Sequence, residues 1–166
     1  MTTVIDGTTG VNRVTDGSIV QADLGPNVAG NGPAFSAYAS SPTSLTSGTT
    51  IKVICQSKEY DTGGFFDTTL SRFTPLVAGY YHFTVGVVLA TASSALQLLI
   101  YKNGVANKQL LNTSPSNVSS ASGGVDIYLN GSTDYVEFMV INSVATQNDL
   151  TGTLSTYFQG FLARAA

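Results

Sequence analysis

The sequence predicts an all-β fold, built as a sandwich of two sheets. Only 10% of the 166 residues are charged, against about 25% in an average globular protein. Val, Thr, Phe and Tyr favour strands, and the scarcity of Lys, Glu, Arg and Met leaves little from which long helices could form. Hydrophobic residues make up 43% of the chain. This is enough apolar material for a full core, which excludes wholesale disorder.

The composition changes near residue 33, and we expect one folded domain preceded by a short arm. Residues 1–33 are rich in Gly, Thr, Asn and Asp, and the stretch 25–33 resembles a linker. The apolar residues of 1–33 occur singly, so they cannot bury a common face by themselves. They suit a segment that docks on a partner in an extended conformation. The arm is therefore either a disordered terminus or an attachment segment at 1–33, and the domain is 34–166. The candidate anchors are Val4, Ile5, Val11, Val14, Ile19, Val20 and Leu24.

From residue 34 onward, strand-like segments follow one another. In the segment 80–89 the alternate residues from Tyr81 are apolar and predict a buried face, while Tyr80, His82 and Thr84 belong to the opposite face. Asn-Gly pairs at 103–104 and 130–131 each separate two strand-like runs. They predict two hairpins in which both turn residues have positive φ. Further strands are expected at 34–38, 51–60, 66–74 and 155–164, which together indicate a sandwich or jelly roll.

Five short motifs follow one another in the folded part. They are Ala34-Phe35-Ser36-Ala37, Phe73-x-Pro75-x-x-x-Gly79-Tyr80-Tyr81-x-Phe83, Tyr101-Lys-Asn-Gly104, Leu129-Asn-Gly131-x-x-Asp134-Tyr-Val136 and Tyr157-Phe-Gln-Gly160-Phe-Leu162. Over residues 34–166 this series resembles the globular head of complement C1q, a branch of the tumour-necrosis-factor-like proteins. The resemblance implies a ten-stranded jelly roll that assembles as a tight homotrimer.

The face that carries Tyr80, His82 and Thr84 is a candidate subunit interface. It is too aromatic for open solvent and too polar for the interior of a sandwich. In line with the axial aromatic residues of the family, we expect Phe158 to join this face from the last strand.

The arm carries a second resemblance. The run Asp6-Gly-Thr-Thr-Gly10-Val-Asn-Arg-Val-Thr-Asp-Gly17 leads into 30–38 and is similar to phage and prophage virion proteins, in which such a knob ends a fibre or decorates a particle. It implies a structural protein on the virion surface, made in the cytoplasm of the host bacterium and attached by its arm to a capsid or tail protein. Two alternatives stay open: an adhesin at a tail-fibre tip that binds a host-surface glycan or protein, and a secreted recognition module.

Charge and cysteine content exclude several other classes. A net charge of −3 and a pI near 4.7 provide no basic stripe for phosphates, so we expect no nucleic-acid binding. The longest apolar run, 85–90, is far too short to span a bilayer, and we see no secretory signal. The single cysteine, Cys55, cannot form an internal disulfide and is expected to be a small core residue of a protein that folds in a reducing cytoplasm.

Catalysis and metal binding find little support in the sequence. There is one histidine, and a Ser-His-Asp site would have to use His82 in the middle of a predicted strand. Zinc lacks the Cys and His ligands that it needs. A structural calcium site stays open, although no loop of alternating aspartates is present and solvated turn residues are the simpler interpretation. We expect no enzyme activity and no cofactor; the candidate calcium ligands are Asp61, Asp67, Asp126, Asp134 and Asp149.

Overall fold

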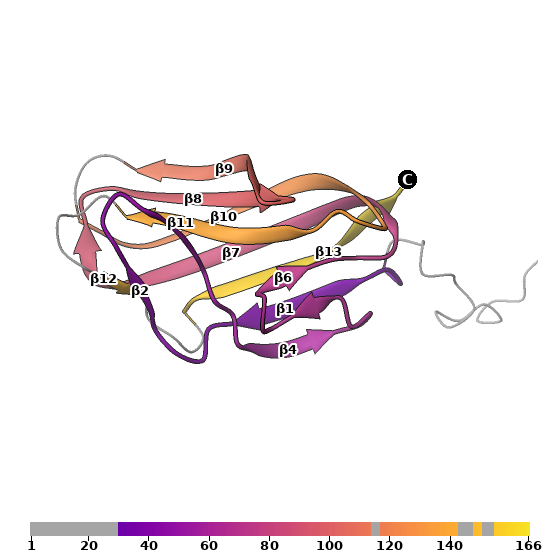
Figure 1. Ribbon diagram of the computed structural model, residues 1–166, viewed down its shortest axis with the longest axis horizontal. Coiled ribbons are helices and arrows are strands. Elements are labelled where there is room, and N and C mark those ends of the chain that lie inside the picture. The colour runs from indigo at the N-terminus through magenta and orange to yellow at the C-terminus, as the bar shows by residue number, and fades with distance from the viewer. Residues whose placement is uncertain (1–29, 114–116, 143–147, 151–154) are drawn as a thin grey trace, which may run out of the picture.

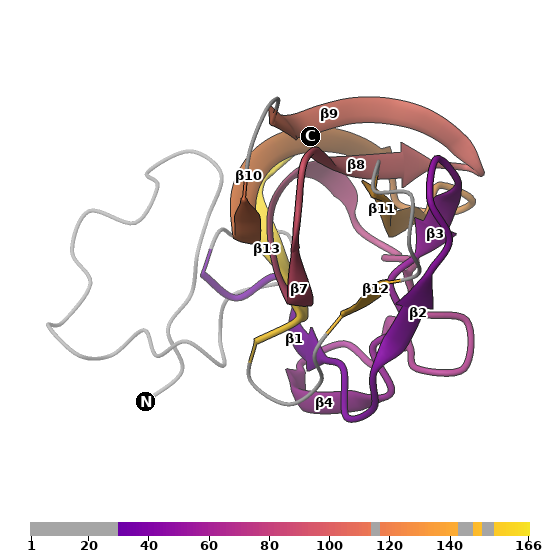
Figure 2. The same cartoon turned by 90° about the vertical axis from the view of Figure 1, so that its left-hand side faces the viewer.

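The computed structural model describes residues 30–113, 117–142, 148–150 and 155–166, which form two antiparallel sheets packed face to face (Figures 1 and 2). The first sheet has the order β2 (Thr43–Leu45), β12 (Asn148–Leu150), β7 (Ala78–Ser93), β13 (Tyr157–Ala165), β1 (Ala34–Tyr38) and β4 (Ser57–Asp61), and β10 (Val118–Asn130) also pairs with β7. The second has the order β5 (Phe66–Asp67), β6 (Arg72–Phe73), β11 (Val136–Asn142), β8 (Leu96–Lys102) and β9 (Val105–Thr113), and β3 (Thr50–Lys52) also pairs with β11. No helix occurs in these ranges.

The predicted all-β jelly roll is confirmed. Within the described ranges, eight strands have five or more residues, and five further strands have only two or three. The long strand β7 runs through the first sheet and pairs with β10 on one side and β13 on the other. Its alternate residues from Tyr81 to Leu89 all point into the sandwich, and each is at most 4% exposed. The two faces predicted for this strand are therefore correct.

A cluster of aromatic rings fills the space between the sheets. The Phe35 ring stacks on Phe73 and Phe66, with centroids 4.5 and 4.8 Å apart, and meets the Phe158 ring edge-on at 5.0 Å. The Phe83 ring lies 5.7 Å from that of Phe158. These rings come from both sheets, so the cluster ties the two layers together.

Two predicted strands are broken in the structure. The segment 51–60 divides into β3 and β4, which belong to different sheets. The residues between these strands pass from the second sheet to the first. Cys55 lies in this crossing, where it is buried as expected and its amide donates to Ser71 Oγ. The segment 66–74 divides into β5 and β6 because the Asp67 side chain accepts the amides of Thr69 and Leu70 and closes a tight turn.

Of the two hairpins predicted from Asn-Gly pairs, the structure forms only the first. Asn103 and Gly104 both have positive φ (54° and 78°) and join β8 to β9, which pair with each other. The second prediction is wrong, because β10 and β11 belong to different sheets and Asn130 is not among the residues with positive φ. There the Asn130 side chain accepts the amides of residues 132–134 and builds a wider loop that crosses between the sheets.

The first described residues and the C-terminus lie at the same end of the sandwich, on the right in Figure 1. The carbonyl of Pro33 accepts the amide of Leu162, and the amide of Ala166 donates to Ala78. The arm therefore joins the domain beside the end of β13.

Candidate functional site

A group of aromatic side chains covers the outer surface of the first sheet. Antiparallel pairing places Tyr128 and Arg164 beside Tyr80, and in the next row Asp126 and Phe161 beside His82. Tyr80, Tyr128 and Phe161 are 50%, 43% and 50% exposed. Together with His82, Thr84 and Asp126, these three residues make up what we call the aromatic face. Three half-exposed rings side by side are typical of a protein interface.

His82 and its neighbours form the polar centre of this face. His82 Nδ1 lies 2.7 Å from Asp126 Oδ1, and Nε2 lies 3.3 Å from Thr84 Oγ1. The imidazole ring also packs on the Phe161 ring, with centroids 5.5 Å apart. On its other neighbour strand the ring lies close to Gly124, where a Cβ would be 3.3 Å from the imidazole, a tight contact. The histidine is thus held in one orientation by groups on three strands.

The structure places Tyr80, His82 and Thr84 together, as predicted, but the prediction for Phe158 is wrong. Phe158 is 1% exposed and belongs to the ring cluster between the sheets. It lies opposite Val85 of β7, which also points inward, whereas Phe161 lies opposite His82. Beside His82, β13 therefore contributes Phe161 to the outer face, and Tyr157 lies further along the same face of this strand.

Asp126, His82 and Thr84 have the order of an acid, a base and a hydroxyl group, but their surroundings do not suit acyl transfer. His82 and Thr84 lie on a central strand that is paired on both sides, with β10 and with β13. Backbone amides in such a strand are occupied by the sheet, so none points to a place where an oxyanion could be stabilised. The arrangement fixes the orientation of the imidazole ring and favours a role in packing.

Two hollows border the aromatic face. The larger, of about 600 Å³, is lined by Tyr80, Asp126 and residues 163–166, where a bulge shifts the register of β13. The smaller, of about 190 Å³, lies between Tyr38, Tyr157, Glu59 and Gln159. Both are open and shallow, which suits side chains of a partner protein better than an enclosed small ligand.

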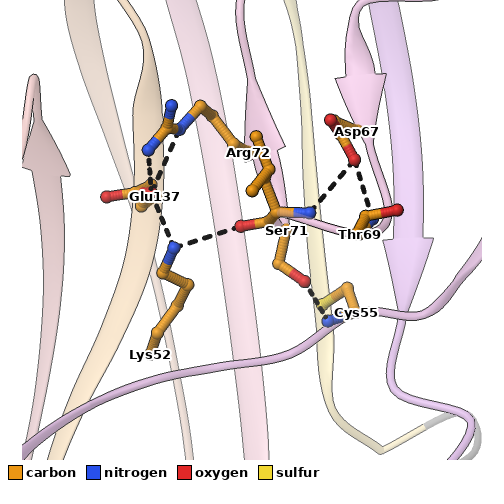
Figure 3. Close-up of polar contacts among 8 residues, drawn as sticks. Lys52, Cys55, Asp67, Thr69, Ser71, Arg72 and Glu137 are labelled. Carbon is orange, nitrogen blue, oxygen red and sulfur yellow. Dashed lines mark hydrogen bonds and ion pairs between the residues drawn. The ribbon is translucent and has the colours of Figure 1, made fainter.

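A separate charged cluster lies on the second sheet (Figure 3). The Glu137 carboxylate on β11 is 3% exposed and accepts from Lys52 Nζ at 2.8 Å and from the Arg72 guanidinium at 3.0 Å. Figure 3 shows both cations directed at the same carboxylate from β3 and β6. The guanidinium also lies 3.7 Å from the centroid of the Tyr135 ring. This cluster joins three strands, and each group in it has a structural partner.

The candidate calcium ligands do not come together in the described residues. Asp61 pairs with Lys58, Asp67 closes the β5–β6 turn, and Asp126 contacts His82. Asp134 pairs with Lys102. The side chain of Asp149 lies outside the described residues, and among those described no three His, Cys, Asp or Glu side chains gather as metal ligands would.

Two pKa shifts report on buried groups. Burial raises the pKa of the Cys55 thiol to about 12, and a hydrogen bond with the Phe158 backbone has a weaker, opposite effect. Burial also tends to raise the pKa of Asp134. Hydrogen bonds from Lys102, Asn103 and the Asn130 amide, together with the charge of Lys102, outweigh it and hold the pKa below its usual value. Asp134 is therefore an ionised structural group, and Cys55 is a neutral one.

The predicted anchors of the arm, from Val4 to Leu24, lie outside the described residues. In the ranges that are described, no helix is long and apolar enough to cross a membrane.

Comparison with solved structures identifies the same fold in several proteins. The globular domain of zebrafish complement 1qA protein is 21% identical, with a TM-score of 0.57 over 81% of this chain and 98% of that one. Murine APRIL is 12% identical, with a TM-score of 0.57 over 78% and 98%. The PRD1 vertex protein P5 is 12% identical, with a TM-score of 0.58 over 80% and 97%.

A search among curated protein sequences found no match. A family model, that of the C1q domain, does match, over residues 34–163. The match begins at the first residue of β1, ends within β13, and spans both sheets, the aromatic face and the Glu137 cluster. The chain therefore belongs to the C1q domain family.

Proposed function

We propose that this protein is a non-enzymatic structural protein of a phage virion: a homotrimeric surface knob that is attached to the particle by its N-terminal arm. A domain of the C1q and tumour-necrosis-factor type fits a structural or recognition module. The observation that carries the proposal is the aromatic face, because it combines half-exposed rings with an oriented polar pair, and no element of the described ranges covers it.

The chemistry of this face suits contact with two further copies of the chain. Interfaces are enriched in Tyr and Phe, and the aromatic face carries Tyr80, Tyr128 and Phe161. The Lys102 ammonium lies at its border, 5.7 Å from the centroid of the Tyr128 ring. The hollows beside it can receive side chains of a neighbouring copy. Because the arm joins one end of the sandwich, three arms leave a parallel trimer at the same end.

The virion role rests on two lines of support. The arm sequence is similar to those of phage and prophage virion proteins, and one protein of the same fold is the vertex protein P5 of PRD1. In this role the knob decorates a capsid or ends a fibre, and its partner is a capsid or tail protein. The absence of a site suited to acyl transfer around His82 supports a non-enzymatic role.

The trimer is tested by sedimentation or light scattering of the purified chain at micromolar concentration. The wild type is expected to have three times the chain mass, and Phe161→Asp is expected to be a folded monomer, because three carboxylates would have to be desolvated at the interface. Val105→Asp is the matched control: Val105 is 68% exposed and lies on β9 of the other sheet. A folded monomeric wild type, or a trimer that tolerates Phe161→Asp, contradicts the proposal.

Electron microscopy of intact particles with an antibody to the knob tests the location. Label on capsid vertices or faces supports a decoration protein. Label on the tail tip, together with loss of host adsorption when the knob is absent, supports the alternative of a receptor-binding adhesin. No label on particles, with the protein in the culture medium, favours the second alternative, a secreted recognition module.

A further inference from the structure

His82 lies at the centre of the aromatic face, and both of its ring nitrogens have a polar neighbour. Nδ1 lies 2.7 Å from Asp126 Oδ1 on β10, and Nε2 lies 3.3 Å from Thr84 Oγ1 on β7. An ionised carboxylate only accepts hydrogen bonds, whereas a hydroxyl group can donate or accept. Both contacts therefore form with a neutral ring and with a protonated ring, so the ring can take up a proton without moving.

The charged and titratable groups around this ring come from three strands. On β10, the Asp126 carboxylate faces Nδ1. On β13, the Phe161 ring packs on the imidazole with centroids 5.5 Å apart. The next row holds Tyr80 on β7, Tyr128 on β10 and Arg164 on β13. In the described ranges, Asp126 is therefore the one carboxylate in contact with the histidine.

Arg164 is the cation that could compete with the histidine for Asp126. The two residues line the same hollow of about 600 Å³. In the parts of the chain that the structure describes, however, no carboxylate forms an ion pair with Arg164, and Asp126 pairs with His82. The Asp126 side chain is 67% exposed and that of His82 38%, so in the single chain water solvates this carboxylate.

We propose that protonation of His82 controls assembly of the knob, so that the trimer is tighter at pH 5.5 than at pH 8. The inference rests on the proposed trimer through the aromatic face and adds its regulation. Contact with a neighbouring copy removes water from Asp126, and a lone carboxylate in an interface is costly unless an opposite charge accompanies it. Histidine ordinarily changes its charge near pH 6.5. The ring can therefore supply the opposite charge by taking up a proton as the interface forms.

Threefold symmetry multiplies this effect. Each copy brings one His82 and one Asp126, so a trimer with neutral rings contains three lone carboxylates and a trimer with protonated rings contains none. A state that binds more protons is favoured as the pH falls, and here that state is the assembled one. His82 is the one histidine of the chain, and the pKa of Cys55 is raised to about 12, so this thiol stays neutral throughout the range.

Sedimentation of the full chain at a series of pH values tests the proposal. The concentration at which half of the trimer dissociates is expected to rise at least about tenfold from pH 5.5 to pH 8. His82→Asn keeps a hydrogen-bond donor beside Asp126 but cannot take up the proton, so its trimer should change less than about twofold over this range. No pH dependence in the wild type, or the same dependence in His82→Asn, would overturn the proposal.

Asp126→Asn provides a second measurement, because the sign of the pH dependence is expected to reverse. The amide carries no charge, so a protonated His82 would become the lone charge in the interface. The trimer of this variant should be weaker at pH 5.5 than at pH 8, whereas a histidine that only packs would show no reversal. Arg164→Gln is the matched control and should keep the dependence of the wild type; its loss there would overturn the proposal.

These outcomes are distinct from a failure of the proposed function. A wild-type trimer of equal strength at every pH overturns the role of His82 and leaves the trimeric knob unaffected. A wild type that is monomeric at every pH overturns both.

Discussion

Two phenylalanines three residues apart on β13 test the assignment of the buried and outer faces. Phe158 is 1% exposed, and its ring lies 5.0–6.2 Å from the rings of Phe35, Phe66, Phe83 and Phe138. Truncating such a side chain to Ala typically costs about 3–5 kcal/mol. For a chain of this size each kcal/mol shifts the melting temperature by roughly 2–4 °C, so Phe158→Ala is expected to lower it by roughly 6–20 °C.

Phe161→Ala is expected to behave differently. Half of the Phe161 surface is exposed in the single chain, so truncation should lower the stability of the fold by about half as much as Phe158→Ala. The exposed half, about 100 Å² of a surface of about 200 Å², is available to a neighbouring copy. At about 25 cal/mol per Å², its loss should weaken assembly by about 2.5 kcal/mol per protomer.

Urea unfolding at several protein concentrations separates the two effects, because only assembly depends on concentration. Phe158→Ala should lower the unfolding midpoint at every concentration. Phe161→Ala should mainly raise the concentration at which trimers dissociate, as seen by sedimentation. If Phe161→Ala destabilises the isolated fold as much as Phe158→Ala, the assignment of the two faces is refuted.

Three further predictions concern other parts of the chain. Glu137→Gln should lower the free energy of unfolding by about 2 kcal/mol in urea titrations, less than a fully buried pair because Lys52 and Arg72 keep some contact with water. Because the pKa of Asp134 is lowered in the folded protein, its ionised carboxylate stabilises the fold above the unfolded pKa of about 3.9, and this stabilisation is lost as the pH falls below that value. The difference in the free energy of unfolding between wild type and Asp134→Asn should therefore become smaller from pH 6 to pH 3. Deleting residues 2–30 should leave a folded knob, because the core begins at Phe35, that no longer joins particles in a co-sedimentation assay.

The fold could be predicted from the sequence because its signals are local. In β7 the alternation of apolar and polar residues has a period of two, so the buried face around Tyr81 follows from the sequence alone. The turn at Asn103 and Gly104 could likewise be predicted locally, because both residue types readily adopt the positive φ that this turn requires. The strands β2 and β12 were missed because each has only three residues and is defined by pairing with the other.

The composition of the aromatic face could be predicted only in part, because it depends on register. Both faces of the strand β13 carry an aromatic residue: Phe158 lies on one face and Phe161 on the other. A shift of one residue exchanges them, and only the pairing of Phe158 with Val85 decides between core and surface. Tyr128 and Asp126 were missed for the same reason, since their place beside Tyr80 and His82 depends on the pairing of β10 with β7.

The Asn130–Gly131 turn shows a second limit on local signals. The dipeptide matches Asn103–Gly104, but Asn130 turns its side chain onto the loop and Asp134 is held by Lys102 and Asn103. Gly131 is still required, because its φ is +67° and a Cβ would overlap the backbone at Ala78. The dipeptide predicts a reversal of the chain; which sheet the next strand joins depends on contacts that are distant in sequence.

The positions of the arm and of the aromatic face together constrain how the proposed knob sits on a particle. The arm enters beside the end of β13, and the C-terminus lies at the same end (Figure 1). In a trimer formed through the aromatic face, this end faces the particle. The link 46–49 between β2 and β3 and the link 94–95 between β7 and β8 lie at the opposite end and then point outward. The residues of these two links are Ser, Thr, Gly and Ala, and such small side chains offer no aromatic anchor to a receptor. These two links therefore add no support to the alternative of an adhesin.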